Sequence, residues 1–421
     1  IGVIFWMHTV SPADTWITGL QELTKPLCHF HSHHNREIPW ATIGPGAPDT
    51  LPLQALASKD QSQSRDGEGQ RTVIVGHWSD PSIVEAIGRW VRGAVGYHES
   101  TTMRIAAAET AAAEIAARGE SASLADVDAL LAEYDERYIL EPPLQNGGAV
   151  RDELRRHARI ELGLMEYLRS GGFGAFTTNT QGDARANVST SPGAGQAIAL
   201  TGLPVQRAMA AGYGYAARGD VRTAALVRAI KTMSAGLEGG ATFLEDHTYA
   251  SGMSGMLVVG ASILEICPSL ATAPVRLKFG SMGRGASAEA GVKPASAVDA
   301  PTVMTPARLV FGAARSRARN VAVVRTGTET ILLVNEAFIP GGDDREIDLP
   351  VPSVIWEPLP DRPRAAECWT LAGGGLHSCL TTSLDSRVLE AWAAVSGMVM
   401  RIIDRNTVVR AFGKQVRGGA R

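Results

Sequence analysis

The pattern of apolar residues changes along this chain, and this change constrains the fold more than any other feature of the sequence. Up to about residue 270, short β-branched and aromatic runs alternate with segments of helical period, which is typical of alternating strands and helices. Beyond that point, runs of strand character follow one another at 308–311, 320–325, 330–335, 346–349 and 353–357. An α/β protein with a β-rich C-terminal part is therefore predicted.

Two of the expected helices have clear N-terminal signals. Ser79 or Asp80 can cap a helix at 81–92, and Asp220 can cap a helix that ends at Gly236. Further helices are expected at 12–23, 104–135, 150–170, 204–211 and 385–397. Strands are expected at 242–249 and 256–266, on either side of a short polar turn.

The length of 421 residues exceeds what one hydrophobic core usually supports. We predict a multi-domain protein with doubly wound α/β domains at 1–100 (N-terminal) and 101–270 (central), and a β-rich, barrel-like C-terminal domain at 301–421. Three stretches, 41–70, 179–200 and 271–307, have no sustained period and are predicted to be structureless, which is unusual inside a compact domain.

Composition excludes several classes of partner and location. A net charge of −3 gives no broad positive field, so neither nucleic acid nor an anionic membrane is expected as a partner. No apolar run approaches the roughly 20 residues of a membrane span. The first residues have neither a basic leader nor a cleavage site, and the 4 scattered cysteines form no disulfide scaffold. A cytoplasmic protein is expected.

Three clusters of polar residues could carry chemistry, and each has a plainer interpretation. His29, His31, His33 and His34 could bind a metal, although such a cluster is more often a surface loop. Glu245, Asp246 and His247 end a strand, where adjacent side chains point to opposite faces, so they could equally be solvated. His377 follows a Gly-rich turn and could be structural.

Nine short strings occur in order along nearly the whole chain: WMHTVSPA (6–13), KPLCHFH (25–31), VGHW (75–78), ARIELG (158–163), GGFGAFTT (171–178), MSAGL (233–237), FLEDHTY (243–249), LEICPS (264–269) and LAGG (371–374). Together they resemble the L-arabinose isomerase family. This resemblance implies an aldose–ketose isomerase that interconverts L-arabinose and L-ribulose through a metal-bound enediol, and in many members also D-galactose and D-tagatose.

The same resemblance implies a divalent ion, usually manganese, held by two Glu and two His, with the two Glu transferring the proton. Glu245 and His377 match one position of each kind, so Glu245 is the expected catalytic residue and both are expected metal ligands. Arg218 and Ser262 stand at the other two positions. An arginine repels a dication, so Arg218 is predicted to pair with Glu245 in a metal-free carboxylate–guanidinium site.

The resemblance also implies sugar contacts from His31, Phe176 and Tyr249, a homo-oligomer, and N-terminal strand–helix units before Ile1 that this sequence does not include. Two alternatives to an active isomerase are favoured by Arg218 and Ser262, and the unpatterned stretches add to the second. The chain could be a catalytically impaired homologue that only binds sugar or assembles, or a pseudogene product in which compensated frameshifts produced 41–70 and parts of 101–125 and 271–300.

Overall fold

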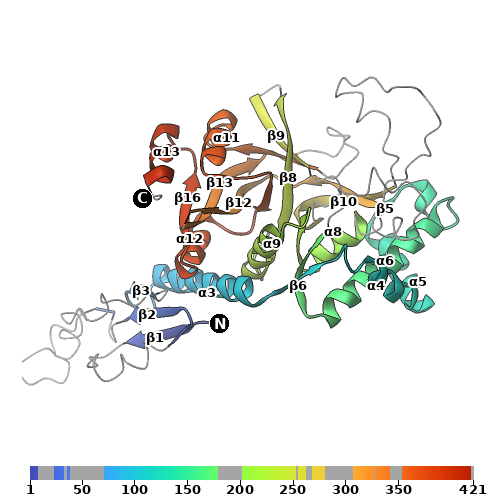
Figure 1. Cartoon of the computed structure of the whole chain (residues 1–421), viewed down its shortest axis with the longest axis horizontal. Helices are drawn as coiled ribbons and strands as arrows, with labels where there is room; N and C mark the ends of the chain where they lie inside the picture. The colour runs from blue at the N-terminus through green and yellow to red at the C-terminus, as the bar shows by residue number, and fades with distance from the viewer. Residues whose placement is uncertain are drawn as a thin grey trace, which may run out of the picture. The chain divides into compact units, whose positions relative to one another are not determined.

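The computed structural model describes residues 1–7, 23–32, 36–37, 71–178, 202–252, 255–261, 268–279, 307–327, 329–341 and 353–418. Most of the helix expected at 12–23, the stretches 41–70 and 179–200, and the strand expected at 346–349 lie outside these residues. The chain divides into two compact units, Ile1–Thr101 with Asp385–Met400, and Thr102–Leu384 with Arg401–Arg421 (Figure 1).

The first unit contains a parallel sheet of β1 (Val3–Met7), β2 (Leu27–His31) and β3 (Arg71–Val75), in that order, with α3 (Pro81–Thr102) and α12 (Ser386–Val395). Its core forms where Cys28 and Phe30 pack against Trp90 of α3 and Val395 of α12. The Asp80 carboxylate accepts the Ser82 N–H at 3.1 Å, so Asp80 is confirmed as the cap of α3. The helix extends ten residues beyond the predicted end.

The second unit begins with a parallel sheet of order β4-β6-β7: β4 (Arg104–Ala107), β6 (Phe173–Thr178) and β7 (Gly214–Ala217). The helices of this part are α4 (Ala112–Glu120), α5 (Leu124–Arg137), α6 (Arg151–Ser170), α8 (Leu203–Ala210) and α9 (Val221–Met233). The prediction of a helix over 104–135 is wrong at its start. Residues 104–107 pair with β6, and this pairing overrides the helical propensity of an Ala-rich segment.

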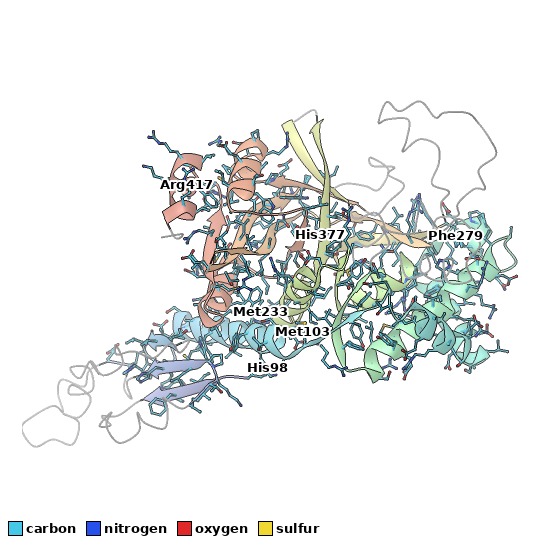
Figure 2. All side chains as sticks on the ribbon, in the orientation of Figure 1. His98, Met103, Met233, Phe279, His377 and Arg417 are labelled. Carbon is cyan, nitrogen blue, oxygen red and sulfur yellow. The ribbon has the colours of Figure 1, made fainter. Side chains whose placement is uncertain are left out.

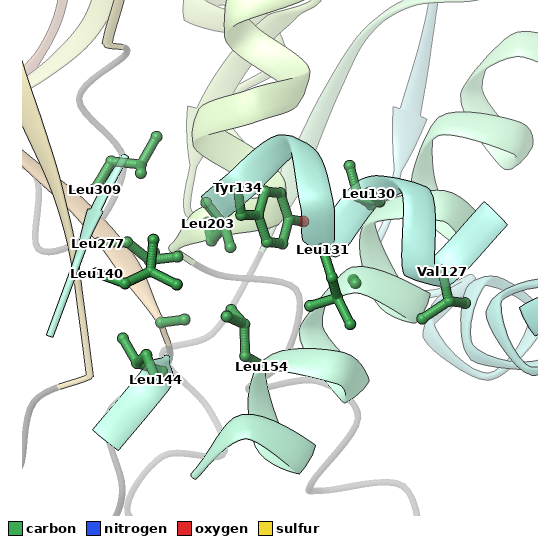
Figure 3. Close-up of a cluster of buried hydrophobic side chains, with 12 residues drawn as sticks. Val127, Leu130, Leu131, Tyr134, Leu140, Leu144, Leu154, Leu203, Leu277 and Leu309 are labelled. Carbon is green, nitrogen blue, oxygen red and sulfur yellow. The ribbon is translucent and has the colours of Figure 1, made fainter. Parts of the chain in front are cut away.

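A cluster of buried leucines joins these helices to a small sheet of order β11-β10-β5, made of β5 (Ile139–Leu140), β10 (Ala271–Lys278) and β11 (Arg308–Ala313). Figure 3 shows Leu131 and Tyr134 of α5 turned toward the same interior as Leu154 and Leu203. The prediction that 271–307 is structureless is therefore wrong for its first eight residues, because Leu277 lies in this core and its strand pairs on both sides.

The larger sheet has the order β12-β15-β8-β9-β14-β13-β16 within the described residues. Its strands are β8 (Ala241–Gly252), β9 (Gly255–Ala261), β12 (Ser316–Thr326), β13 (Glu329–Ile339), β14 (Ser353–Pro358), β15 (His377–Thr381) and β16 (Val399–Ile403). Because β12 also pairs with β13 along its whole length, the pairings of all strands except β16 close into a ring. The β-rich C-terminal part is confirmed, although α11 (Arg362–Leu371) and α13 (Val409–Gly418) were not predicted.

The helices in the described parts of the chain include none that is both long enough and apolar enough to cross a bilayer.

Candidate active site

Two strands and one turn of the second unit bring the candidate residues together. Glu245 lies on β8, and His377 is the first residue of β15. These strands are antiparallel neighbours whose register pairs His377 directly with Glu245, and paired residues project on the same face of a sheet. Figure 2 marks His377 beside β8. Arg218 and Asp220 come from the turn between β7 and α9.

The carboxylate of Glu245 is the centre of this group. Its side chain is only 4% exposed, and its Oε1 lies 2.7 Å from Nη2 of Arg218. The same oxygen lies 3.8 Å from Nε2 of His377. The predicted carboxylate–guanidinium pair is therefore confirmed, and it forms at the position where the resemblance implies a metal ligand.

Arg218 reaches Glu245 from an unusual backbone conformation. Its φ is 57°, in the left-handed region that costs a residue with a β-carbon about 1–2 kcal/mol. The following residue is Gly219, with φ 71°, which adopts that conformation without a steric penalty. The turn is fixed on both sides, since the Gly219 N–H donates to the carbonyl of Thr178 at 3.2 Å and the Asp220 N–H to that of Ala217 at 3.1 Å.

Asp220 links the site to α9. As predicted, it caps the helix: its Oδ1 accepts the backbone N–H of Thr223 at 3.0 Å. Its Oδ2 also accepts the hydroxyl of Thr223 at 2.7 Å and lies 3.0 Å from Nδ1 of His377. The sequence predicted the cap but not the contact with His377, because these residues are 157 positions apart.

These contacts change the acid–base properties of both groups. Burial alone lowers the pKa of His377, but the hydrogen bond to Asp220 and the nearby negative charges of Glu245 and Asp220 outweigh it and raise the pKa to about 9. Burial alone raises the pKa of Asp220, but hydrogen bonds from His377 and Thr223 lower it to about 2. At neutral pH the imidazole is therefore a cation and a proton donor, and Asp220 is ionised.

A row of aromatic rings supports His377 from behind. The ring of Phe243 meets the imidazole edge to face with centroids 5.1 Å apart, Tyr215 meets Phe243 at 5.5 Å, and Phe176 meets Tyr215 at 5.0 Å. The hydroxyl groups of Tyr215 and Thr178 are hydrogen-bonded at 2.6 Å. Such packing holds the imidazole in one orientation.

Three family models cover nearly all of this chain. Those of the L-arabinose isomerase N-terminal, central and C-terminal domains match residues 1–102, 100–236 and 240–399. The chain belongs to the L-arabinose isomerase family. Proteins named L-arabinose isomerase from Herpetosiphon aurantiacus, Aeromonas hydrophila and Geobacillus thermodenitrificans are 38%, 36% and 34% identical to it. The alignments cover 99%, 97% and 99% of this chain, and 83%, 81% and 83% of these relatives.

The remaining predicted site residues of this L-arabinose isomerase family member are not all brought to the site. Phe176 is fully buried behind Tyr215, so a direct contact with sugar stays a prediction. His31 belongs to β2 of the first unit, where its ring lies 3.9 Å from that of His29. Tyr249 lies on β8 and pairs with Val258, but its side chain, like the whole of Ser262, is outside the described residues.

A metal-binding shell is absent from the part of the chain that the structure describes, because no three His, Cys, Asp or Glu side chains there are arranged to hold an ion. The relatives are named as isomerases, and Glu245 and His377, which the resemblance implies as two of four metal ligands, lie next to each other.

Replacing Asp220 with asparagine is expected to lower the pKa of His377 from about 9 toward the ordinary value of 6.5, because the neutral amide no longer stabilises the imidazolium. Titration of the histidine side chains by NMR measures this change. The variant Asp385→Asn is the matched control, because Asp385 caps α12 with the same contact and belongs to the other unit. An unchanged titration of His377 in Asp220→Asn would contradict the assignment.

Proposed function

We propose that this chain is an aldose–ketose isomerase that acts on L-arabinose, with Glu245 as the residue that carries the migrating proton. The observation that supports it most is the direct pairing of Glu245 with His377 on β8 and β15, in a chain that matches its family over almost its whole length. The names of the relatives supply the substrate, L-arabinose, and the product is then L-ribulose.

The reaction moves one proton from carbon 2 to carbon 1 of the open-chain sugar and a second from the hydroxyl on carbon 2 to the oxygen on carbon 1. It passes through an enediol and needs no external oxidant or reductant. A carboxylate can take the proton from carbon 2 and return it to carbon 1. His377 Nε2 lies 3.8 Å from the Glu245 carboxylate, so an oxygen of the same substrate can accept a hydrogen bond from the imidazolium. In this proposal, Glu245 carries the proton between the two carbons. His377 donates a proton to the oxygen on carbon 1 and takes one back from the hydroxyl on carbon 2.

Manganese, which the resemblance implies, fits the described residues poorly. The guanidinium of Arg218 already contacts the Glu245 oxygen at 2.7 Å, and an arginine neither releases its proton nor ligates a cation. No step of the proposed reaction therefore runs through a metal. Because one member of the family's proton-transfer pair is replaced, turnover is expected to be slower than that of the relatives by about 10²–10⁴-fold.

The test is ketose formation from L-arabinose, followed by carbon-13 NMR over long incubations, with D-galactose in parallel as the second sugar. We expect slow L-ribulose formation that is unchanged by a chelator and abolished in Glu245→Gln. The exposed carboxylate of Glu238 provides the control variant, Glu238→Gln, which is expected to keep the activity. Conversion of neither sugar would contradict the proposal.

A second candidate function is sugar binding without turnover, and the Arg218–Glu245 pair favours it, since that pair holds the proton-transfer carboxylate in an ion pair. Calorimetric binding of L-arabinose with no ketose formed would support this alternative. We also propose, from the family alone, a cytoplasmic homo-oligomer. Sedimentation velocity tests the assembly, and a monomer at all concentrations would overturn it.

A further inference from the structure

We propose that the guanidinium of Arg218 takes the place of a divalent ion in this site. It binds the oxygens of an aldose and prevents a metal ion from binding. The identity of the sugar rests on the proposed function. The exclusion of metals does not, because it follows from the contacts of Arg218 and Glu245 alone.

The position of the guanidinium carries the first step of the argument. It lies on Oε1 of Glu245, the same oxygen that faces His377. A metal held by Glu245 and His377 would need the space beside that oxygen. The backbone that carries Arg218 is fixed next to this oxygen, because the N–H groups of the following two residues donate to the carbonyls of Thr178 and Ala217.

The second step of the argument is the charge of Glu245 and Arg218. Glu245 is 4% exposed, so its negative charge needs a nearby positive charge to remain buried. Arg218 supplies that charge, since an arginine guanidinium is a cation in proteins. A divalent ion at this carboxylate would meet a fixed positive charge at short range, where little water screens the repulsion.

The third observation is exposure, which shows that Arg218 is the most open of the three groups to an incoming ligand. The side chain of Arg218 is 35% exposed, whereas those of Glu245 and His377 are 4% and 13% exposed. The guanidinium thus spans the buried carboxylate and the surface. Planar N–H donors of this kind hydrogen-bond to hydroxyl and carbonyl oxygens, which are the groups that a neutral aldose offers.

The metal arm of the test uses manganese alone and needs no sugar. Electron paramagnetic resonance measures free Mn²⁺ in the presence of the full chain, and thermal unfolding with and without Mn²⁺ provides a second readout. The unchanged chain is expected to bind no manganese at micromolar concentrations. Arg218→Glu, which replaces the cation with a second carboxylate, is expected to bind it at least about ten-fold more tightly.

Arg222→Glu is the charge-matched control, because Arg222 is exposed on the first turn of α9 and this substitution changes the net charge by the same amount. It is expected to leave manganese binding unchanged. If Arg218→Glu does not fold, Arg218→Gly removes the cation at a positive φ that glycine tolerates, and a smaller gain is expected. Tight manganese binding by the unchanged chain, or no gain in a folded Arg218 variant, would overturn the exclusion of metals.

The sugar arm measures L-arabinose binding by calorimetry in the presence of a chelator. Arg218→Gln is expected to weaken binding by about ten- to hundred-fold, because a charge-assisted hydrogen bond is lost, and Arg218→Lys is expected to restore part of it. Arg222→Gln is expected to change nothing. If Arg218→Gln binds L-arabinose as tightly as the unchanged chain, the proposed sugar contact is overturned. If the unchanged chain binds no L-arabinose, the proposed function is contradicted. In that case the manganese experiment still decides whether Arg218 excludes metals.

Discussion

Replacing Arg207 with alanine is expected to lower the free energy of unfolding by about 3–5 kcal/mol, because it leaves the buried carboxylate of Glu161 without its cation. Glu161 of α6 is 5% exposed. Its Oε1 accepts Nε of Arg207 from α8 at 2.6 Å, and its Oε2 accepts the hydroxyl of Tyr134 from α5 at 2.6 Å. One carboxylate therefore joins three helices of the second unit.

Arg207 has further partners in the same network. Its Nη1 donates to the hydroxyl of Tyr138 at 2.8 Å and its Nη2 to Glu133 at 3.0 Å, and it lies over the ring of Tyr134. Burial raises the pKa of Glu161, and Arg207 and Tyr134 offset only part of this effect. The network thus compensates for a costly burial, and removing one partner is expected to be worse than replacing both.

Chemical denaturation measures the loss, with two comparisons. Arg155 and Asp128 form an equally short pair, 2.6 Å, but both side chains are exposed, so Arg155→Ala is expected to cost less than about 1 kcal/mol. The double variant Arg207→Met with Glu161→Gln is expected to recover much of the stability lost in Arg207→Ala. A loss below about 1 kcal/mol in Arg207→Ala would show that the network is not needed.

Acidification is expected to destabilise the chain through His157, which is neutral when folded. Its side chain is 4% exposed; Nδ1 bonds to the carbonyl of Glu153 at 3.0 Å, and Nε2 accepts the N–H of Ala307 at 3.3 Å. Burial, with a smaller effect of Arg156, lowers the pKa of His157 from 6.5 to about 4. The unfolded chain therefore binds a proton at a pH where the folded chain does not.

The sign follows from this order of pKa values. Above pH 6.5 the imidazole is neutral in both states, so its ionisation contributes nothing. As the pH falls from 6.5 toward 4, stability falls by about 3 kcal/mol in total, and the effect levels off below the folded pKa. Unfolding measured across this range in the unchanged chain and in His157→Gln tests it. The free energy of unfolding is expected to change less steeply with pH in the variant, even if the variant is less stable overall. If it changes as steeply as in the unchanged chain, groups other than His157 cause the pH dependence.

Local signals predicted much of the fold. The caps of α3 and α9 follow from Asp80 and Asp220 because a capping side chain acts within three residues of its helix. Errors arose where distant pairing decided the structure. Residues 104–107 became a strand by pairing with β6, and β10 formed between β11 and β5, contacts that no local pattern encodes.

The candidate site divides in the same way. The ion pair of Arg218 with Glu245 could be predicted. The resemblance puts both residues at positions that share one metal ion, and opposite charges at such a distance attract each other. The contact of Asp220 with His377 was not, because a helix cap gives no sign that its second oxygen will meet a residue from another sheet. The aromatic support through Tyr215 and Phe243 likewise depends on how β7 and β8 pack.

The site residues come from two kinds of structure, which differ in how easily they can be altered. Glu245 and His377 are held opposite each other by ladder hydrogen bonds inside a ring of strands, so neither can move without breaking sheet pairings. Position 218 lies outside that ring, in a turn with a left-handed backbone between β7 and α9. A single substitution there can exchange an anion for a cation while the scaffold is unchanged. The charge next to Glu245 is therefore set by a turn position that the pairings of the sheet do not constrain.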